Sequence, residues 1–145
     1  IFFDGTLNNR TNIDQRLVSV SDDKLTAAAV LSAGAAALGR PVNIFLQYWA
    51  LDAFRADRID RPHGLAPEAG EEGQRRVNAL SAAGQQTWAE TFRQVKELGG
   101  VDIEACSLSM ELLGIGPEDL DPLVDGVEGV TSFHLNAGSG PLVFI

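Results

Sequence analysis

The chain has 145 residues and carries 11 Lys and Arg against 20 Asp and Glu, for a formal net charge of −9. This length fits one domain with one hydrophobic core. Such a charge repels phosphate backbones, and no Lys/Arg cluster reverses it locally, so nucleic acid is excluded as a partner class. A single cysteine cannot form an internal disulfide. That excludes the disulfide-stapled secreted scaffolds and predicts a reducing, cytoplasmic compartment.

The longest apolar stretch does not predict a membrane span. It runs from Leu25 to Leu38, consists mostly of alanine and is too short to cross a bilayer. We therefore expect a soluble protein without a membrane partner.

The first third of the chain predicts two strands and one helix. Ile1–Phe3 has the apolar character of a strand end. Ser21 begins an N-capping run for a helix over Lys24–Leu38, and Gly39 stops that helix. Val42–Leu46 reads as a second, buried strand.

The middle of the chain changes character twice. Residues 55–84 are rich in Arg, Asp, Glu, Gly and Pro, which predicts a polar surface insertion with at most one short helix. Helical periodicity returns over Thr87–Leu98, where Trp88, Phe92 and Val95 follow at spacings of four and three.

The last third predicts two more strands and short helices. Val101–Cys106 is a third strand, and Ser107–Leu113 is a short helix closed by Gly114. Val127–Leu135 fits a helix better than a strand, and Pro141–Ile145 reads as a final strand. Strands that alternate with helices predict one α/β domain with a parallel sheet covered on both faces.

One early motif resembles a catalytic loop. Phe3-Asp4-Gly5-Thr6-Leu7 is similar to the Asp-Gly-Thr end of the phosphatase loop in haloacid-dehalogenase-like enzymes. That loop needs a phosphoryl-accepting Asp two residues before Asp4, where this chain has Phe2. Phenylalanine cannot attack phosphorus, so the pattern favours a strand that ends in a glycine turn.

No metal or cofactor site is predicted. His63 and His134 are the two histidines, and neither has a second His, Cys or carboxylate at ligand spacing. His63 falls in the polar insertion, where we expect a solvated side chain, and His134 fits a half-buried position. Neither a Gly-x-Ser-x-Gly elbow nor a glycine-rich phosphate loop occurs.

Cys106 occupies a more informative position, because it ends a predicted strand and opens a predicted helix. In open parallel sheets, ligands and chemistry gather at the carboxyl edge. The unpaired N–H groups and dipole of the following helix favour an anion there, and the thiolate is the reactive form of a thiol. A lone cysteine also serves as a small buried hydrophobe, so a packing role stays open.

The segment around this cysteine resembles the signature Cys-x-x-Ser-Met-x-x-x-Gly-Ile of DsrE/DsrF/DsrH-like proteins. The matching run is Cys106-Ser107-Leu108-Ser109-Met110-Glu111-Leu112-Leu113-Gly114-Ile115. Similarity extends to Pro117-Glu118-Asp119-Leu120, to Val127-Glu128-Gly129-Val130, and upstream to the segment from Ala35 to Leu51. Residues 55–84 fall outside it.

The resemblance implies a fold and a reaction. It implies a three-layer α/β/α fold with a mainly parallel five-stranded sheet, and assembly into oligomers. It also implies that Cys106 carries sulfur as a persulfide between rhodanese-like donors, TusA-like carriers and downstream enzymes, without a metal or organic cofactor. No second cysteine is present to resolve that persulfide as an internal disulfide.

Two functional hypotheses follow. In the first, Cys106 relays sulfane sulfur, and Ser107 and Ser109 surround the sulfur with hydroxyls or helix-capping contacts. In the second, the domain is a non-catalytic binding or assembly module in which the cysteine only packs. There Tyr48, Trp49 and Phe133 line a ligand or subunit contact. In either case we expect a homo-oligomer, because the alanine-rich helix and the aromatic residues offer more apolar surface than a small domain hides.

Overall fold

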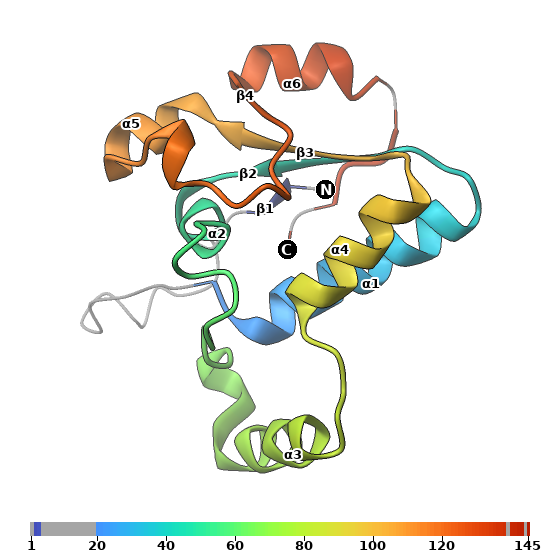
Figure 1. Ribbon diagram of the computed structural model, residues 1–145, viewed down its shortest axis with the longest axis vertical. Helices are drawn as coiled ribbons and strands as arrows, with labels where there is room; N and C mark the ends of the chain where they lie inside the picture. Colours follow the sequence, from blue (N-terminus) through green and yellow to red (C-terminus); the bar gives the residue numbers. More distant parts are fainter. Residues whose placement is uncertain (1, 4–19, 139, 144) are drawn as a thin grey trace.

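A computed structural model describes residues 2–3, 20–138, 140–143 and 145 of the chain (Figure 1). It shows an α/β fold with a parallel sheet flanked by helices. The strands pair in the order β1-β2-β3-β4, and every pairing is parallel. They are β1 (Phe2–Phe3), β2 (Val42–Leu46), β3 (Val101–Cys106) and β4 (Gly126–Glu128).

Helices cover the two faces of this sheet unequally. α1 and α4 pack side by side on one face, whereas α6 is the helix that lies over the opposite face among the described residues (Figure 1). α2 and α5 contact each other beside the sheet. The helices are α1 (Asp22–Ala37), α2 (Tyr48–Ala53), α3 (Gly70–Ala82), α4 (Trp88–Leu98), α5 (Ser107–Leu113) and α6 (Val130–Asn136). Two 3-10 turns span Pro67–Ala69 and Pro117–Asp119.

Most predicted elements are confirmed near their expected bounds, because local signals determine them. Thr87 is the N-cap of α4: its side chain accepts from the Glu90 amide, and the Glu90 carboxylate accepts from the Thr87 amide. Gly114 ends α5 in the left-handed conformation, with φ 64°, where a residue with a Cβ is strained.

The expected five-stranded sheet is not what the described residues form, because they contain four strands. Of the predicted last strand, residues 141–143 and 145 have no strand conformation. The fourth strand is β4 instead, within a segment expected to be mostly helix. That segment divides at Gly129, because Glu128 still pairs with Cys106 while Val130 already begins α6. The Asp4-Gly5-Thr6 motif lies outside the described residues.

The register between β2 and β3 distributes side chains to the two faces. Pairing runs from Val42 opposite Val101 to Leu46 opposite Ala105. Because successive strand residues point to opposite faces, Val101, Ile103 and Ala105 enter the main core.

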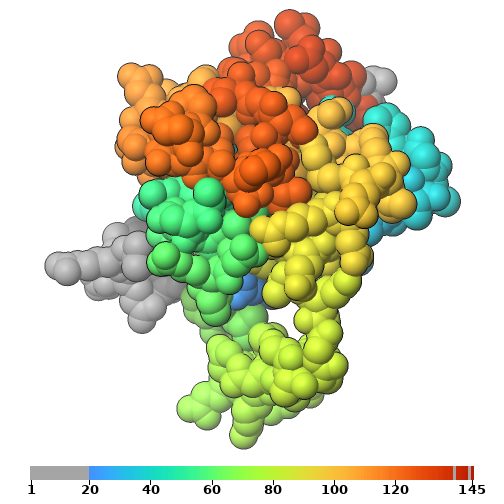
Figure 2. All heavy atoms as spheres, viewed as in Figure 1, coloured from blue at the N-terminus to red at the C-terminus, as the bar shows by residue number. Residues whose placement is uncertain are grey.

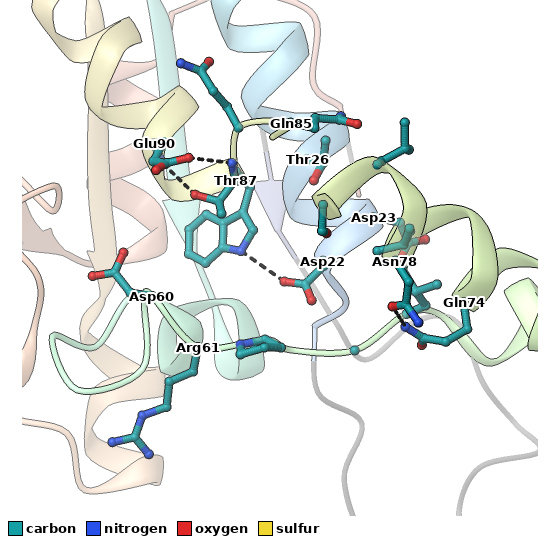
Figure 3. A pocket seen from close by; sticks show the side chains of 18 of the residues that line it. Asp22, Asp23, Thr26, Asp60, Arg61, Gln74, Asn78, Gln85, Thr87 and Glu90 are labelled. Carbon is teal, nitrogen blue, oxygen red and sulfur yellow. Dashed lines mark hydrogen bonds between the residues drawn. The ribbon is translucent and has the colours of Figure 1, made fainter. Parts of the chain in front are cut away.

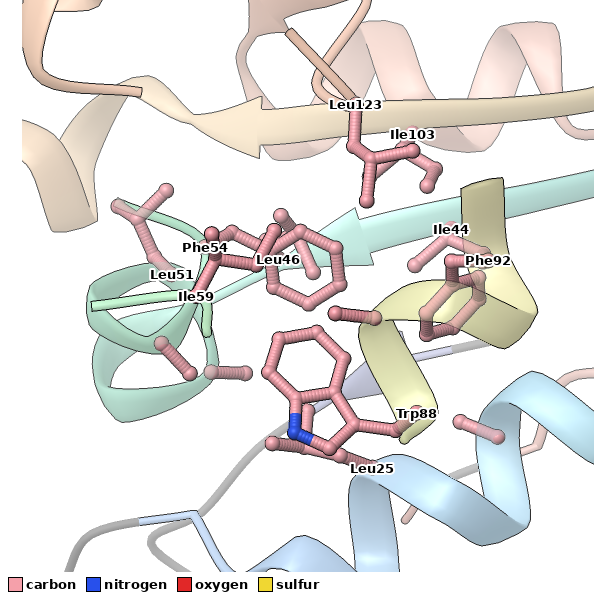
Figure 4. Packing of buried hydrophobic residues seen from close by; sticks show 14 of the residues in the cluster. Leu25, Ile44, Leu46, Leu51, Phe54, Ile59, Trp88, Phe92, Ile103 and Leu123 are labelled. Carbon is pink, nitrogen blue, oxygen red and sulfur yellow. The ribbon is translucent and has the colours of Figure 1, made fainter. Parts of the chain in front are cut away.

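The main core lies between the sheet and the α1–α4 layer. Phe54, Trp88 and Phe92 form its aromatic centre (Figure 4), with Phe54 ring centroids 5.1 Å from Trp88 and 5.6 Å from Phe92. Trp88 and Phe92 are the periodic residues that predicted α4. Their spacing in the sequence therefore indicates which face of α4 packs on the sheet.

The polar insertion is more helical than expected. α3 has 13 residues, where at most one short helix was predicted, and none of its side chains is buried. Ion pairs between Glu72 and both Arg75 and Arg76 support it locally, at the i+3 and i+4 spacings that favour isolated helices. Figure 2 shows α3 set apart from the body of the molecule. Within the described residues, no helix is long and apolar enough to cross a membrane.

We predict that Phe92→Ala lowers the free energy of unfolding by about 3–5 kcal/mol, because it leaves a cavity in a fully buried site. The matched control is Leu98→Ala at the end of the same helix, where the side chain is 67% exposed. It should change the free energy by no more than about 0.5 kcal/mol. Urea titrations of the three proteins measure both effects. Equal effects of the two substitutions would contradict this description of the core.

Candidate functional site

Cys106 lies where the sequence predicts it, at the end of β3 and at the N-cap of α5. Its backbone is extended, with φ −72° and ψ 114°, and the next residue is helical. The carboxyl ends of β2, β3 and β4 meet at this edge, because the three strands are parallel and in register. The edge is the usual location of chemistry in an open parallel sheet.

The cysteine faces away from the main core. Cys106 alternates with Ala105 and belongs to a small separate cluster with Phe45 and Phe133, against which Ala137 packs. Only 3% of Cys106 is exposed. The Phe45 and Phe133 rings stack 4.7 Å apart at 19°. The thiol therefore lies on the face of the sheet opposite the main core, on the side of α6 (Figure 1).

Carboxylates share this face and edge with the cysteine. Glu104 lies two residues earlier on β3, and Glu128 of β4 pairs directly with Cys106. The Glu104 side chain lies over Gly126, where an added Cβ would approach Glu104 Oε2 to 2.7 Å. Because Gly126 has no side chain, the Glu104 carboxylate can occupy the space above it.

The environment of Glu104 disfavours its charge. Partial burial raises the pKa of Glu104, and the negative charges of Glu128, Asp125 and Asp102 raise it further. Lys96 opposes the shift, but it pairs directly with Asp125. Cys106 therefore lies beside carboxylates that repel one another, an environment that favours the neutral form of Glu104.

The two predicted serines have different environments. Ser107 begins α5 and is exposed, and its Oγ lies 4.0 Å from where a Cβ of Gly129 would be. Ser109 is buried, and its Oγ has no hydrogen-bond partner among the described residues. A buried hydroxyl without a partner costs stability, so packing alone does not account for Ser109.

Tyr48 and Trp49 lie at the same edge but not in the cysteine cluster. Both are half-buried at the start of α2, which contacts α5. Among the described residues, the cluster around Cys106 does not include them. Tyr48 has φ 45°, a left-handed conformation that is uncommon for a residue with a Cβ. The sequence did not predict this backbone conformation, because no glycine next to Tyr48 indicates a left-handed residue there.

The other residues of the Cys106–Ile115 signature have structural roles. Met110 and Ile115 are buried in the main core. Gly114 supplies the left-handed end of α5. These three positions are explained by folding, whereas Cys106 and Ser109 are the positions that folding explains least.

The histidines differ from expectation in opposite ways. His63 was expected to be solvated, but its ring lies 5.8 Å from that of Trp88 and its buried Nε2 has no hydrogen-bond partner among the described residues. Burial lowers the pKa of His63, although Asp22 opposes the shift. His134 was expected to be half-buried but is exposed, beside Phe133 on α6. Neither lies in the cysteine cluster.

A cavity of about 770 Å³ lies between α3 and the ends of α1 and α4, away from the predicted site residues (Figure 3). Its carboxylates already have partners within the protein. Asp22 accepts from Trp88 Nε1 and the His63 amide, and Asp23 accepts from the Ala66 amide. The cavity lies away from Cys106, and the candidate site remains the edge at that cysteine.

Within the described residues, no group of three or more His, Cys, Asp or Glu side chains is arranged to hold a metal ion.

Comparison with known proteins does not assign the chain to a family. No protein family matches the chain, and no curated protein sequence matches it significantly. The resemblance to DsrE-like proteins therefore depends on the motif residues themselves.

We predict that Glu104→Gln stabilises the protein at neutral pH, because it removes a charge that the folded state disfavours. A raised folded-state pKa means that the folded protein binds more protons than the unfolded chain, so stability falls as pH rises through that range. The melting temperature of the variant should therefore exceed that of wild type at pH 7. The difference should shrink below the ordinary value of 4.5, where both states are protonated.

Thermal melts between pH 3.5 and pH 8 provide the measurement, with the exposed Glu111→Gln as a control for loss of one charge. A difference that does not depend on pH would contradict the assignment.

Proposed function

We propose that this protein is a DsrE-like sulfur carrier in which Cys106 accepts sulfane sulfur as a persulfide and passes it on. The observation that carries the proposal is the position of Cys106 between β3 and α5 at the carboxyl edge of a parallel sheet. The start of α5 favours an anionic group at the sulfur, whereas the nearby Glu104 and Glu128 oppose one.

The transfer requires no cofactor and no net oxidation. The Cys106 thiolate attacks the outer sulfur of a donor persulfide, forming a new S–S bond as the donor S–S bond breaks. The donor leaves as a thiolate, and its electron pair goes with it. The Cys106 persulfide then gives up its outer sulfur to an acceptor thiolate by the same exchange.

Features that folding does not explain support this function. The Ser109 hydroxyl has no hydrogen-bond partner among the described residues and belongs to the first turn of α5, and Ser107 is exposed beside Gly129. Tyr48 and Trp49 add a half-buried aromatic surface at the same edge, on which a partner could pack.

The charge around the cysteine favours a particular kind of partner. Glu104 and Glu128 flank Cys106, and the whole chain carries a net charge of −9. A rhodanese-like donor or TusA-like acceptor with basic residues around its own thiol would be attracted and oriented by this charge. The expected homo-oligomer and the cytoplasmic location stay predictions.

A second candidate function is favoured by the burial of the thiol. Because Cys106 packs against Phe45 and Phe133 and is only 3% exposed, it also fits a packing residue. The protein would then be a non-catalytic binding or assembly module of the same fold. The two functions differ in whether sulfur is ever bound.

We predict that wild-type protein incubated with polysulfide gains about 32 Da per sulfur atom bound, measured by intact mass spectrometry. Because the chain has one cysteine, Cys106→Ser should abolish the gain while circular dichroism shows an unchanged fold. Loaded protein mixed with a small acceptor thiol should lose the added mass.

Sulfur retained on the serine variant would contradict the relay function. Wild-type protein that takes up no sulfur, even when partly opened with mild urea, would leave the binding module as the function.

A further inference from the structure

The buried state of Cys106 raises the question of how another protein reaches it. Phe45 lies beside the thiol within the sheet, and Phe133 covers it from α6. Phe133 is only 1% exposed, so the aromatic ring is fully inserted. A sulfur exchange needs a second thiol aligned with the sulfur under attack. In the arrangement described here that approach is blocked.

The covering helix is short, and most of its side chains are exposed. α6 has seven residues, and Phe133 is the only one of them that is buried. Val130 and Leu135 are exposed to 46% and 79%, so they do not attach α6 to the sheet. A side-chain hydrogen bond from Asn136 Nδ2 to Glu128 Oε2, 3.0 Å long, provides a second tether.

Glycines flank this helix. Gly129 is its N-cap, and Gly138 follows its C-cap with φ 66°. Glycine has access to more backbone conformations than other residues, so both connections can change direction at low cost. Local opening of small units with few buried contacts is a general property of folded proteins. α6 has the character of such a unit, whereas α4 on the opposite face buries four residues.

We propose that α6 is a gate over Cys106, with the Phe133 ring as its latch and the Asn136–Glu128 hydrogen bond as a second tether. This inference rests on the proposed sulfur-carrier function, for which it supplies the regulation. Closed, the gate slows the access of solvent and of small thiols to the persulfide. Open, it exposes the sulfur at the carboxyl edge, where a partner can align its own thiol.

The gate makes the reactivity of Cys106 depend on α6 and not on global unfolding. The probe is N-ethylmaleimide, whose reaction with the single cysteine is followed by intact mass in the absence of any sulfur donor. Phe133→Ala should accelerate labelling by at least about 10-fold and up to about 10³-fold, because a buried aromatic ring no longer favours the closed state. Leu135→Ala, at an exposed position of the same helix, should leave the rate unchanged.

Two further variants separate a gate from simpler explanations. Phe133→Ala also leaves a hole beside the thiol, whereas Asn136→Ala removes the tether without making one. The gate predicts about 2- to 10-fold faster labelling for Asn136→Ala, the effect of one net hydrogen bond. Phe92→Ala lowers global stability on the opposite face, and the gate predicts that it has little effect on the rate. The labelling rate should also depend only weakly on low urea concentrations, because a small opening exposes little surface.

Several results would overturn the gate. These are a wild-type rate equal to that of a free cysteine peptide, no response to Asn136→Ala, or acceleration by Phe92→Ala as large as that by Phe133→Ala. The gate and the sulfur function fail separately, because labelling uses no sulfur and loading is measured by the gain in mass. If Phe133→Ala labels quickly but never gains sulfur, the gate stands and the carrier function falls.

Discussion

The alternation of side chains along β3 is the constraint on which the rest of the site depends. Val101, Ile103 and Ala105 enter the main core, so Cys106 is directed to the opposite face. Pairing with β2 over five residue pairs holds this register. A slip of one residue would exchange the two faces, placing Glu104 in the apolar core and removing the thiol from its aromatic neighbours.

The two faces of the sheet consequently have different physical characters. α1 and α4 bury a continuous apolar layer with an aromatic centre at Phe54, Trp88 and Phe92. On the other face, α6 contributes one buried side chain, Phe133. More apolar side chains are therefore buried on the first face than on the second within the described residues. The second face therefore suits a reactive group that is shielded from solvent in one state and accessible to a partner in another.

The candidate site is identified by residues whose environment is not explained by packing or by helix ends. Within the signature that begins at Cys106, Met110 and Ile115 fill the core and Gly114 ends a helix. Ser109 keeps a buried hydroxyl without a partner among the described residues, and Glu104 has a raised pKa among other carboxylates. Such locally unfavourable groups tend to gather at functional sites, because stability elsewhere compensates for them.

Local signals were sufficient to predict much of the fold. The Thr87–Glu90 capping box of α4 and the 3.6-residue spacing of its apolar residues depend on neighbours in sequence. Ser21 is the N-cap of α1 as predicted, but its side chain makes no capping hydrogen bond there. β2 is a mainly apolar segment and β3 alternates apolar with acidic residues, so both strands were also visible in the sequence. The placement of Cys106 between a strand and a helix followed from the same signals.

Only the tertiary structure decided the remaining features. α3 is a 13-residue helix that buries none of its side chains, and its polar composition did not indicate that length. β4 is a strand only because β3 provides its hydrogen-bonding partner. The expected strand at residues 141–145 is absent from the described part of that segment, since an apolar run alone does not guarantee a pairing partner. The sequence by itself determined that Cys106 ends a strand and begins a helix. Its burial beneath Phe133 depends on a contact between residues 27 positions apart, which requires the whole sheet to bring them together.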